Sequence, residues 1–125
     1  MSSTPLHLDT SFLIRAFIPA SVESSQLRSW LNEGRKPVMS TIAWAEFLCG
    51  PLSDEHLENA TLIVEEHLPF TSEDAALAAE LFNNTGRKRR IFRDCLIAAV
   101  ALRQGADLAT SNQEDFERLG VPLAL

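Results

Sequence analysis

Four acidic residues occupy positions that suit a metal-binding or catalytic site: Asp9, Glu46, Asp94 and Asp115. Two carboxylates about 4 Å apart repel by roughly 4 kcal/mol at an effective dielectric of 20, so a cluster of them must take up a proton or a cation. Hard oxygen ligands select Mg²⁺ or Mn²⁺. Such an ion lowers the pKa of a bound water and neutralises charge on a phosphodiester under attack. If these acids meet in space, they predict a divalent-metal site with hydrolytic chemistry.

Each acid must be weighed against a purely structural role. Asp94 precedes an unbroken apolar run from Cys95 to Leu102, which indicates a central helix buried on nearly all sides. An aspartate at such a place can simply cap the helix, and the same holds for Asp9, which follows a short strand. Both roles remain open for these two residues from the sequence.

Glu46 is the only charged residue between Ser40 and Gly50. In so apolar a helix it either reaches solvent past the edge or faces a polar site, because an isolated buried carboxylate is costly. Near the C-terminus, Ser111 and Glu114 fit an S-x-x-E capping box, which explains both without any function. The box does not explain Asn112 or Asp115, which follow the end of a strand.

The order of expected elements predicts a three-layer α/β/α sandwich around a short central parallel sheet of four to five strands, in one domain spanning residues 1–125. Helices that alternate with short strands imply right-handed crossovers and strand ends that share one edge of the sheet, where the acids would converge. The expected strands are 6–9, 36–39, 68–70, 106–109 and an edge strand at 121–123; the expected helices begin near 10, 22, 40, 54, 71, 94 and 111.

Charge is unevenly distributed along the chain. The net charge of −6 argues against nucleic acid as a partner, but five of the eleven basic residues lie between positions 87 and 93. Placed directly before Asp94, they predict a surface that steers phosphates towards an acidic site, with a solvated loop as the alternative. The five residues are Arg87, Lys88, Arg89, Arg90 and Arg93.

The compartment follows from what the sequence lacks. The first five residues do not have the layout of a secretory leader, and no apolar run approaches the 18 or so residues that cross a bilayer. Cys49 and Cys95 lie far apart within apolar helical patterns, which predicts reduced core residues. We therefore expect a soluble, cytoplasmic protein without membrane contact.

Four segments together resemble the motifs of the PIN-domain ribonucleases, in the compact form of VapC-type toxins. The resemblance spans almost the whole chain in order, and it implies a PIN-like fold and a divalent-metal-dependent endoribonuclease that uses Mg²⁺ or Mn²⁺. It further implies a homodimer and a cognate antitoxin whose C-terminal segment enters the acidic groove. The segments are Leu8–Ser11, Ser40–Gly50, Asp94–Ala99 and Thr110–Phe116.

The resemblance also implies individual roles. Asp9 and Asp94 would be the principal metal ligands, while Glu46 and Asp115 would act directly or through water. Supporting roles would fall to three polar residues around the last motif and the first: Asn112 would complete the site, Thr110 would orient its loop, and Ser11 stands where many relatives have asparagine.

Three other interpretations compete with that of a PIN-domain ribonuclease. A haloacid-dehalogenase-like phosphatase needs a second aspartate two residues after the first, where this chain has Ser11. A phospho-accepting receiver domain needs adjacent acids and a late lysine, but the only lysines are Lys36 and Lys88. A catalytically silent PIN fold that binds RNA or another protein is the non-enzymatic alternative, and the presence of all four acids counts against it.

Overall fold

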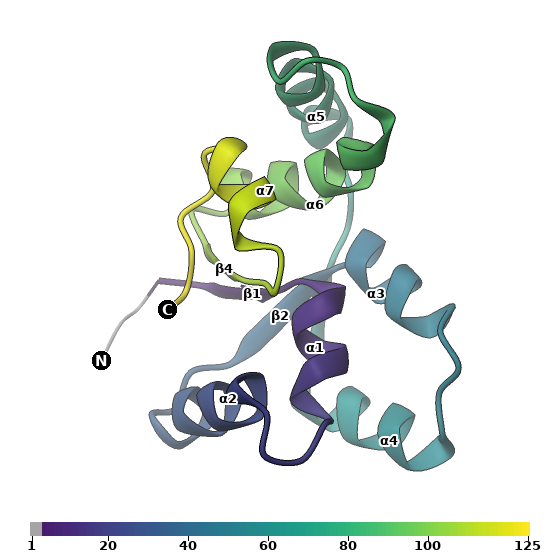
Figure 1. The fold of residues 1–125 in the computed structure, drawn as a ribbon, viewed down its shortest axis with the longest axis vertical. Helices are drawn as coiled ribbons and strands as arrows, with labels where there is room; N and C mark the ends of the chain where they lie inside the picture. Colours follow the sequence, from purple (N-terminus) through teal and green to yellow (C-terminus); the bar gives the residue numbers. More distant parts are fainter. Residues whose placement is uncertain (1–3) are drawn as a thin grey trace.

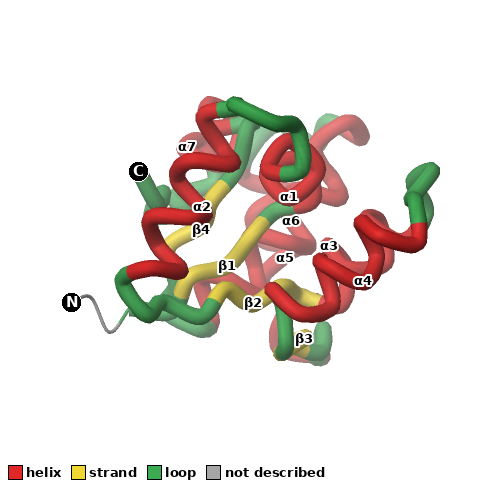
Figure 2. Tube along the Cα trace, turned by 90° about the horizontal axis from the view of Figure 1, so that it is seen from below, coloured by secondary structure: helices red, strands yellow, loops and turns green. Residues whose placement is uncertain are grey.

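The computed structural model describes residues 4–125 and has a four-stranded parallel sheet at its centre. The strands are β1 (Leu6–Leu8), β2 (Pro37–Ser40), β3 (Glu66–Leu68) and β4 (Asp107–Ala109), in the order β3-β2-β1-β4. Figure 2 shows β1 and β2 in the middle of the sheet. Because every pairing is parallel, all four strands end at the same edge, as the alternation of elements predicts.

Helices cover both faces of the sheet. Figure 1 shows α5 and α6 on one side and α1, α2 and α4 on the other, which confirms the three-layer α/β prediction. The helices are α1 (Thr10–Ala16), α2 (Val22–Asn32), α3 (Thr41–Leu48), α4 (Asp54–Ile63), α5 (Ser72–Asn84), α6 (Phe92–Arg103) and α7 (Gln113–Arg118), with a short 3₁₀ turn, η1 (Arg89–Ile91), before α6.

Helix α6 is the central helix that the apolar run predicts. Its residues from Ile97 to Ala101 are all buried, as is Cys95. Small side chains along this stretch let the helix lie close to both the sheet and α5, which packs along it. The helix therefore has little freedom to move, and groups in its first turn are held in place by the core.

Two of the expected helix starts are confirmed by their hydrogen bonds. The Ser40 hydroxyl accepts from the Ala43 N–H at 3.1 Å and caps α3. At the start of α5, Thr71 and Asp74 form a reciprocal capping box. Both helices begin where a side-chain oxygen satisfies an N–H that the helix itself leaves unpaired.

The capping interpretation is wrong for three other residues. Helix α6 begins at Phe92, so Asp94 lies inside its first turn and Ile91 occupies the cap position. Asp9 precedes α1, but its side chain makes no capping hydrogen bond. Helix α7 starts after Asn112, and the Ser111 hydroxyl donates instead to Glu23 Oε2 at 3.3 Å.

Several boundaries also differ from expectation. The third strand is 66–68 rather than 68–70, and the expected edge strand 121–123 forms only an isolated bridge from Leu123 to Leu108. Cys49 is exposed at the end of α3 rather than in the core, as is its neighbour Leu48 within the helix. No helix within residues 4–125 is long and apolar enough to cross a membrane.

Candidate active site

The four acids that the sequence singles out line one cavity. It has a volume of about 380 Å³ and lies where β1 ends and where α6 and α7 begin. Two residues that sequence reasoning did not place here, Thr10 and Ile14, also contribute to its wall. The full lining is Asp9, Thr10, Ser11, Ile14, Glu46, Arg90, Arg93, Asp94, Asn112 and Asp115.

Asp9 is positioned by the sheet and by two hydroxyl groups. Its backbone N–H donates to the Ala109 carbonyl at 2.9 Å, which continues the β1–β4 pairing to the cavity edge. The Thr110 and Ser11 hydroxyls both donate to Asp9 Oδ2, at 2.7 and 2.9 Å. With Asp9 only 3 % exposed, these bonds hold a buried carboxylate in one orientation at the cavity wall.

The two hydroxyls are themselves held by the loop that follows β4. The Asn112 N–H donates to Thr110 Oγ1 at 2.9 Å, and the Ser111 N–H donates to Ser11 Oγ at 3.2 Å. Each hydroxyl therefore accepts from the backbone and turns its own proton towards Asp9. Sequence reasoning named Thr110, Ser11 and Asn112, but this chain of donors depends on a loop geometry that no spacing reveals.

The Thr10 hydroxyl has a different hydrogen-bond partner from that of its neighbour Ser11. Its hydroxyl is buried and donates to the Ala43 carbonyl of α3 at 2.9 Å. The bond connects the start of α1 to the helix that carries Glu46. It therefore fixes the distance between two walls of the cavity without touching an acid.

Asp94 is the electrostatically least satisfied group of the cavity. Burial, and then the negative charges of Asp9 and Asp115, raise its pKa to about 6, while Arg93 and Arg90 act in the opposite direction. A raised carboxyl pKa means that the ionised form is disfavoured where it stands. The cavity therefore favours a positive species close to Asp94.

Glu46 and Asp115 are each paired with an arginine. Arg93 forms an ion pair with Glu46, and Arg90 Nη1 lies 3.3 and 3.2 Å from the two carboxylate oxygens of Asp115. Both arginines are more than half exposed, whereas the two acids are about a quarter exposed. Sequence reasoning placed these arginines on an RNA-binding surface and missed that their side chains reach the acids.

The predicted basic surface is thus divided by the structure. Arg90 and Arg93 line the acid cavity, whereas Arg87 and Arg89 line a second pocket. Lys88 is exposed and occupies the cap position of η1. The five residues therefore do not form one uniform patch.

The donor set of the cavity suits a hydrated divalent ion. Its acidic side chains offer hard oxygens, and Asp9 is the first charged neighbour that disfavours ionised Asp94. Within residues 4–125, no three or more His, Cys, Asp or Glu side chains are grouped so that together they could hold a metal ion. Mg²⁺ usually binds through one or two carboxylates and keeps several waters, so Asp9 and Asp94 fit this mode.

Comparison with known families identifies the class of protein. The PIN domain model matches residues 6–122, so the chain belongs to the PIN domain family. This confirms the resemblance inferred from the four motifs. No curated protein matches the chain.

Solved structures show the same fold over nearly the whole chain. VapBC2 from Rickettsia felis, bound to a promoter DNA fragment, is 20 % identical with a TM-score of 0.77 and covers 97 % of this chain and 98 % of that one. DNA-bound VapBC from Salmonella typhimurium is 21 % identical, with a TM-score of 0.74 and 97 % coverage of both chains. Mycobacterium tuberculosis VapC20, described as a toxin that cleaves the sarcin–ricin loop, is 15 % identical with a TM-score of 0.71 and covers 95 % of this chain and 98 % of that one.

Proposed function

We propose that this protein is a divalent-metal-dependent endoribonuclease and the toxin of a toxin–antitoxin pair. The observation that carries the proposal is the single cavity lined by Asp9, Glu46, Asp94 and Asp115. Burial and the charges of Asp9 and Asp115 raise the pKa of Asp94 to about 6, and carboxyls perturbed in this way are concentrated at functional sites. Membership of the PIN family supports the nuclease assignment.

Asp9 and Asp94 would hold Mg²⁺ or Mn²⁺, and Glu46 and Asp115 would contribute directly or through water. When bound, such an ion would supply Lewis acidity and neutralise charge that develops on the phosphodiester. Thr110 and Ser11 would keep the Asp9 carboxylate oriented, and Asn112 would hold Thr110 through its backbone N–H. Glu46, half-buried in the same cavity, would accept a proton from an attacking water once Arg93 moves away.

The arginines at the cavity rim would bind the substrate. Arg90 and Arg93 are more than half exposed and carry positive charge at the mouth of an acidic site. An RNA phosphate that enters the cavity can replace Asp115 or Glu46 as the partner of these side chains, because charge-assisted bonds from guanidinium to phosphate are strong. The substrate would thereby be drawn towards the acids that otherwise repel it.

Cleavage of a mixed RNA pool tests the nuclease assignment. We expect the wild-type protein to cleave with Mg²⁺ or Mn²⁺ and to be inactive in EDTA. Asp94→Asn and Asp9→Asn should each lower the rate by more than roughly 100-fold, the upper range for loss of a group that merely supports a ligand. Asp54→Asn is the matched control, since Asp54 is also an aspartate in the first turn of a helix but is exposed and remote from the cavity.

Equal cleavage by the wild-type and both cavity variants would contradict the mechanism. RNA binding without cleavage under any metal condition would favour a catalytically silent PIN module instead. In either case the control shows whether any loss of rate comes from general damage to the protein.

The toxin assignment is supported by solved structures of similar fold, which include a toxin–antitoxin complex from Klebsiella pneumoniae and the Mycobacterium tuberculosis toxin VapC20. We propose that a cognate antitoxin places a segment in the acidic cavity, and that the toxin itself is a cytoplasmic homodimer. Expression in a bacterial host is expected to stop growth, and the Asp94→Asn variant is expected to leave growth normal. Growth arrest by both proteins would show that toxicity does not come from the acid cavity.

A further inference from the structure

A second pocket shares η1 and the start of α6 with the acid cavity, and the proposed function assigns it no role. It has a volume of about 470 Å³ and is lined by Phe82, Arg87, Arg89 and Phe92. We call it the aromatic–arginine pocket. The two rings meet edge to face with centroids 5.5 Å apart, and Phe92 remains 48 % exposed. A phenylalanine that is half in water leaves apolar surface for a ligand to cover.

Both pockets take lining residues from η1 and from the first turn of α6. Arg89 and Phe92, three positions apart, face the aromatic–arginine pocket, while Arg90, Arg93 and Asp94 face the acid cavity. Residues three apart share one side of a helix, so Arg89 with Phe92 and Arg90 with Arg93 lie on adjacent sides of η1 and the start of α6. Ile91 and Cys95 are buried between them and anchor the turn in the core.

The loop that brings Arg87 to the pocket has a defined shape. Arg87 adopts a positive φ of 57°, which is uncommon for a residue with a side chain, and follows Gly86 at φ 92°. Its N–H donates to the Phe82 carbonyl at 3.1 Å and ties the loop to the end of α5. A strained residue that is held in this way is typical of binding sites.

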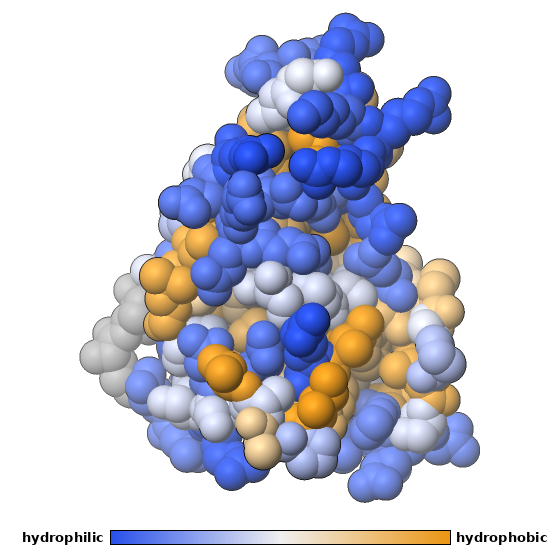
Figure 3. All heavy atoms as spheres, viewed as in Figure 1, coloured by the Kyte–Doolittle hydropathy of each residue, from blue (hydrophilic) through white to orange (hydrophobic). Residues whose placement is uncertain are grey.

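Charge distinguishes this pocket from the acid cavity. Within residues 4–125, Arg87 and Arg89 form no ion pair, whereas Arg90 and Arg93 are both paired with acids. In Figure 3 the end of the molecule that carries α5 is mainly hydrophilic, with apolar surface visible between the hydrophilic side chains. An exposed ring beside two free guanidinium groups combines the features that bind single-stranded nucleic acid.

We propose that the aromatic–arginine pocket binds a nucleotide of single-stranded RNA that flanks the cleavage site, with its base against Phe92 and its phosphate on Arg87 and Arg89. This inference rests on the proposed nuclease function and assigns part of its substrate-binding surface. Every base has a stacking face, so the pocket would select single strands rather than a particular sequence. In the chain, the pocket residues Arg89 and Phe92 are directly followed by Arg90 and Arg93, which line the acid cavity.

Binding of a fluorescent single-stranded RNA octamer in EDTA tests the proposal without any cleavage. Phe92→Leu keeps apolar volume but removes the ring, and should weaken binding about 5- to 100-fold, the range for loss of one base–aromatic stack. Arg89→Gln should weaken binding and lower the salt slope by about 0.7, whereas Phe92→Leu should leave the slope unchanged. Thermal melting of each variant shows that it is folded.

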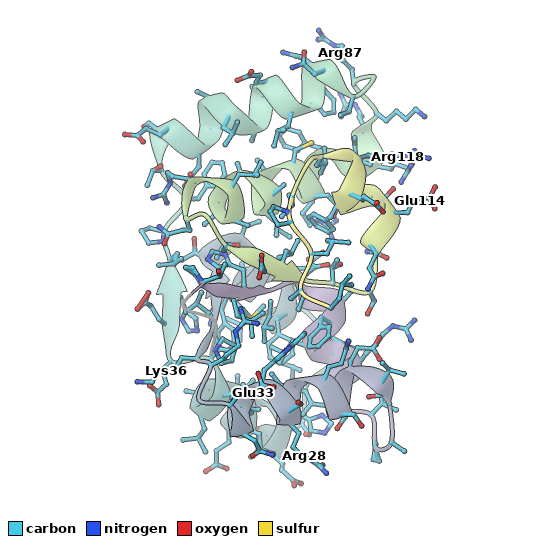
Figure 4. The ribbon with its side chains drawn as sticks, turned by 90° about the vertical axis from the view of Figure 1, so that its left-hand side faces the viewer. Arg28, Glu33, Lys36, Arg87, Glu114 and Arg118 are labelled. Carbon is cyan, nitrogen blue, oxygen red and sulfur yellow. The ribbon has the colours of Figure 1, made fainter. Side chains whose placement is uncertain are left out.

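Two matched controls use the same substitutions elsewhere. Phe17→Leu removes a partly exposed ring from a separate apolar pocket, and Arg28→Gln removes an exposed arginine at the end of the molecule opposite Arg87 (Figure 4). Both should bind RNA as the wild type does. Absence of RNA binding by the wild type, or equal weakening by test and control variants, would overturn the proposal.

An abasic site moved along the octamer identifies the contact itself. At one position the missing base should weaken binding to the wild type but not to Phe92→Leu, because both changes remove the same stack. Independent effects at every position would overturn base stacking and would leave charge, or a peptide partner, as the role of the pocket. Loss of cleavage in Asp94→Asn is scored separately, so failure of the nuclease mechanism is distinguishable from failure of this subsite.

Discussion

Two aspartates lie near opposite ends of α6, and the pKa values of their carboxyl groups are shifted in opposite directions. Asp74 is completely buried and accepts hydrogen bonds from Arg103, with Nη2 at 3.0 Å from Oδ2, and from the Thr71 N–H. Although burial alone would raise its pKa, these bonds to Arg103 and Thr71 lower it below the ordinary value. Asp94 is only half-buried, yet burial and two acidic neighbours raise its pKa to about 6.

The contrast separates a structural carboxylate from a functional one. Asp74 has every partner that it needs within the protein, so it stabilises the start of α5 and its packing on α6. Asp94 is left beside Asp9 and Asp115, which makes the folded protein less stable in the absence of a cation. Burial of a carboxylate therefore does not identify a site, whereas burial without compensation does.

The contrast should be clearest when Asp74 is removed. Asp74→Ala loses the capping bond to Thr71 and the charge-assisted bonds to Arg103, so the free energy of unfolding should fall by roughly 2–4 kcal/mol. Urea denaturation gives this value, and RNA cleavage per folded molecule should stay at the wild-type rate. A stable variant that has lost cleavage would reverse the roles assigned to the two aspartates.

The hydroxyl donors to Asp9 should show the next largest effect. Thr110→Val removes the donor to Asp9 Oδ2 and should weaken Mn²⁺ binding roughly 10- to 100-fold, the range for groups that orient a metal ligand. Thr85→Val is the matched control, because it loses a threonine hydroxyl that donates to the Leu81 carbonyl at 2.7 Å and does not line the acid cavity. Calorimetry should find lower stability but unchanged Mn²⁺ affinity for the control, and equal affinity loss in both would refute the orienting role.

The pH dependence of stability should have opposite signs for the two carboxyls. Between the ordinary value of 3.8 and about 6, folded Asp94 holds a proton more readily than unfolded Asp94 does, so its contribution to stability falls as pH rises through this window. For Asp74 the pKa is lowered, so its contribution is present above the ordinary value and is lost as pH falls below it.

Thermal melting of the metal-free protein measures the first of these effects. The wild type should become less stable relative to Asp94→Asn as pH rises from about 4 to about 6, and the difference should then level off. A difference that is constant over this range would show that Asp94 is not electrostatically strained.

The smallest effect is expected at the cavity rim. Arg90→Gln frees Asp115 from an exposed ion pair, and since such pairs are worth about 0.2–1 kcal/mol, Mn²⁺ affinity should rise by no more than about 5-fold. Arg89→Gln removes the same charge from the adjacent position, which faces the other pocket. Identical Mn²⁺ affinities for the two variants would mean that Arg90 acts only through its general charge.

Much of the fold could be predicted because its signals are local. Apolar runs specify the central helix, and side-chain oxygens specify the starts of α3 and α5 at Ser40 and Thr71. Predictions failed where tertiary contacts override a local pattern. Ser111 has the pattern of a cap, but its hydroxyl donates to Glu23 of α2. Cys49 lies in an apolar run but is exposed to solvent.

The acids of the site could be named in advance because unpaired carboxylates are unusual in apolar surroundings. What spacing could not show is which acids are paired within the protein. Asp74 and Asp94 both lie in the first turn of a helix, and the structure distinguishes them by the bonds of Asp74 to Arg103 and Thr71 and by the acidic neighbours of Asp94. In the same way, the sequence does not distinguish the adjacent arginines Arg89 and Arg90, but their side chains face different pockets.

Titration of the metal-free protein with Mn²⁺ by calorimetry at pH 7.5 (about 1.5 units above the Asp94 pKa) tests the central claim most directly. The wild type and Asp74→Asn should bind Mn²⁺ with the same affinity, whereas Asp94→Asn should show no binding. Binding that persists in Asp94→Asn, or that is lost in Asp74→Asn, would contradict the claim that the uncompensated charge of Asp94 is there to hold a divalent cation.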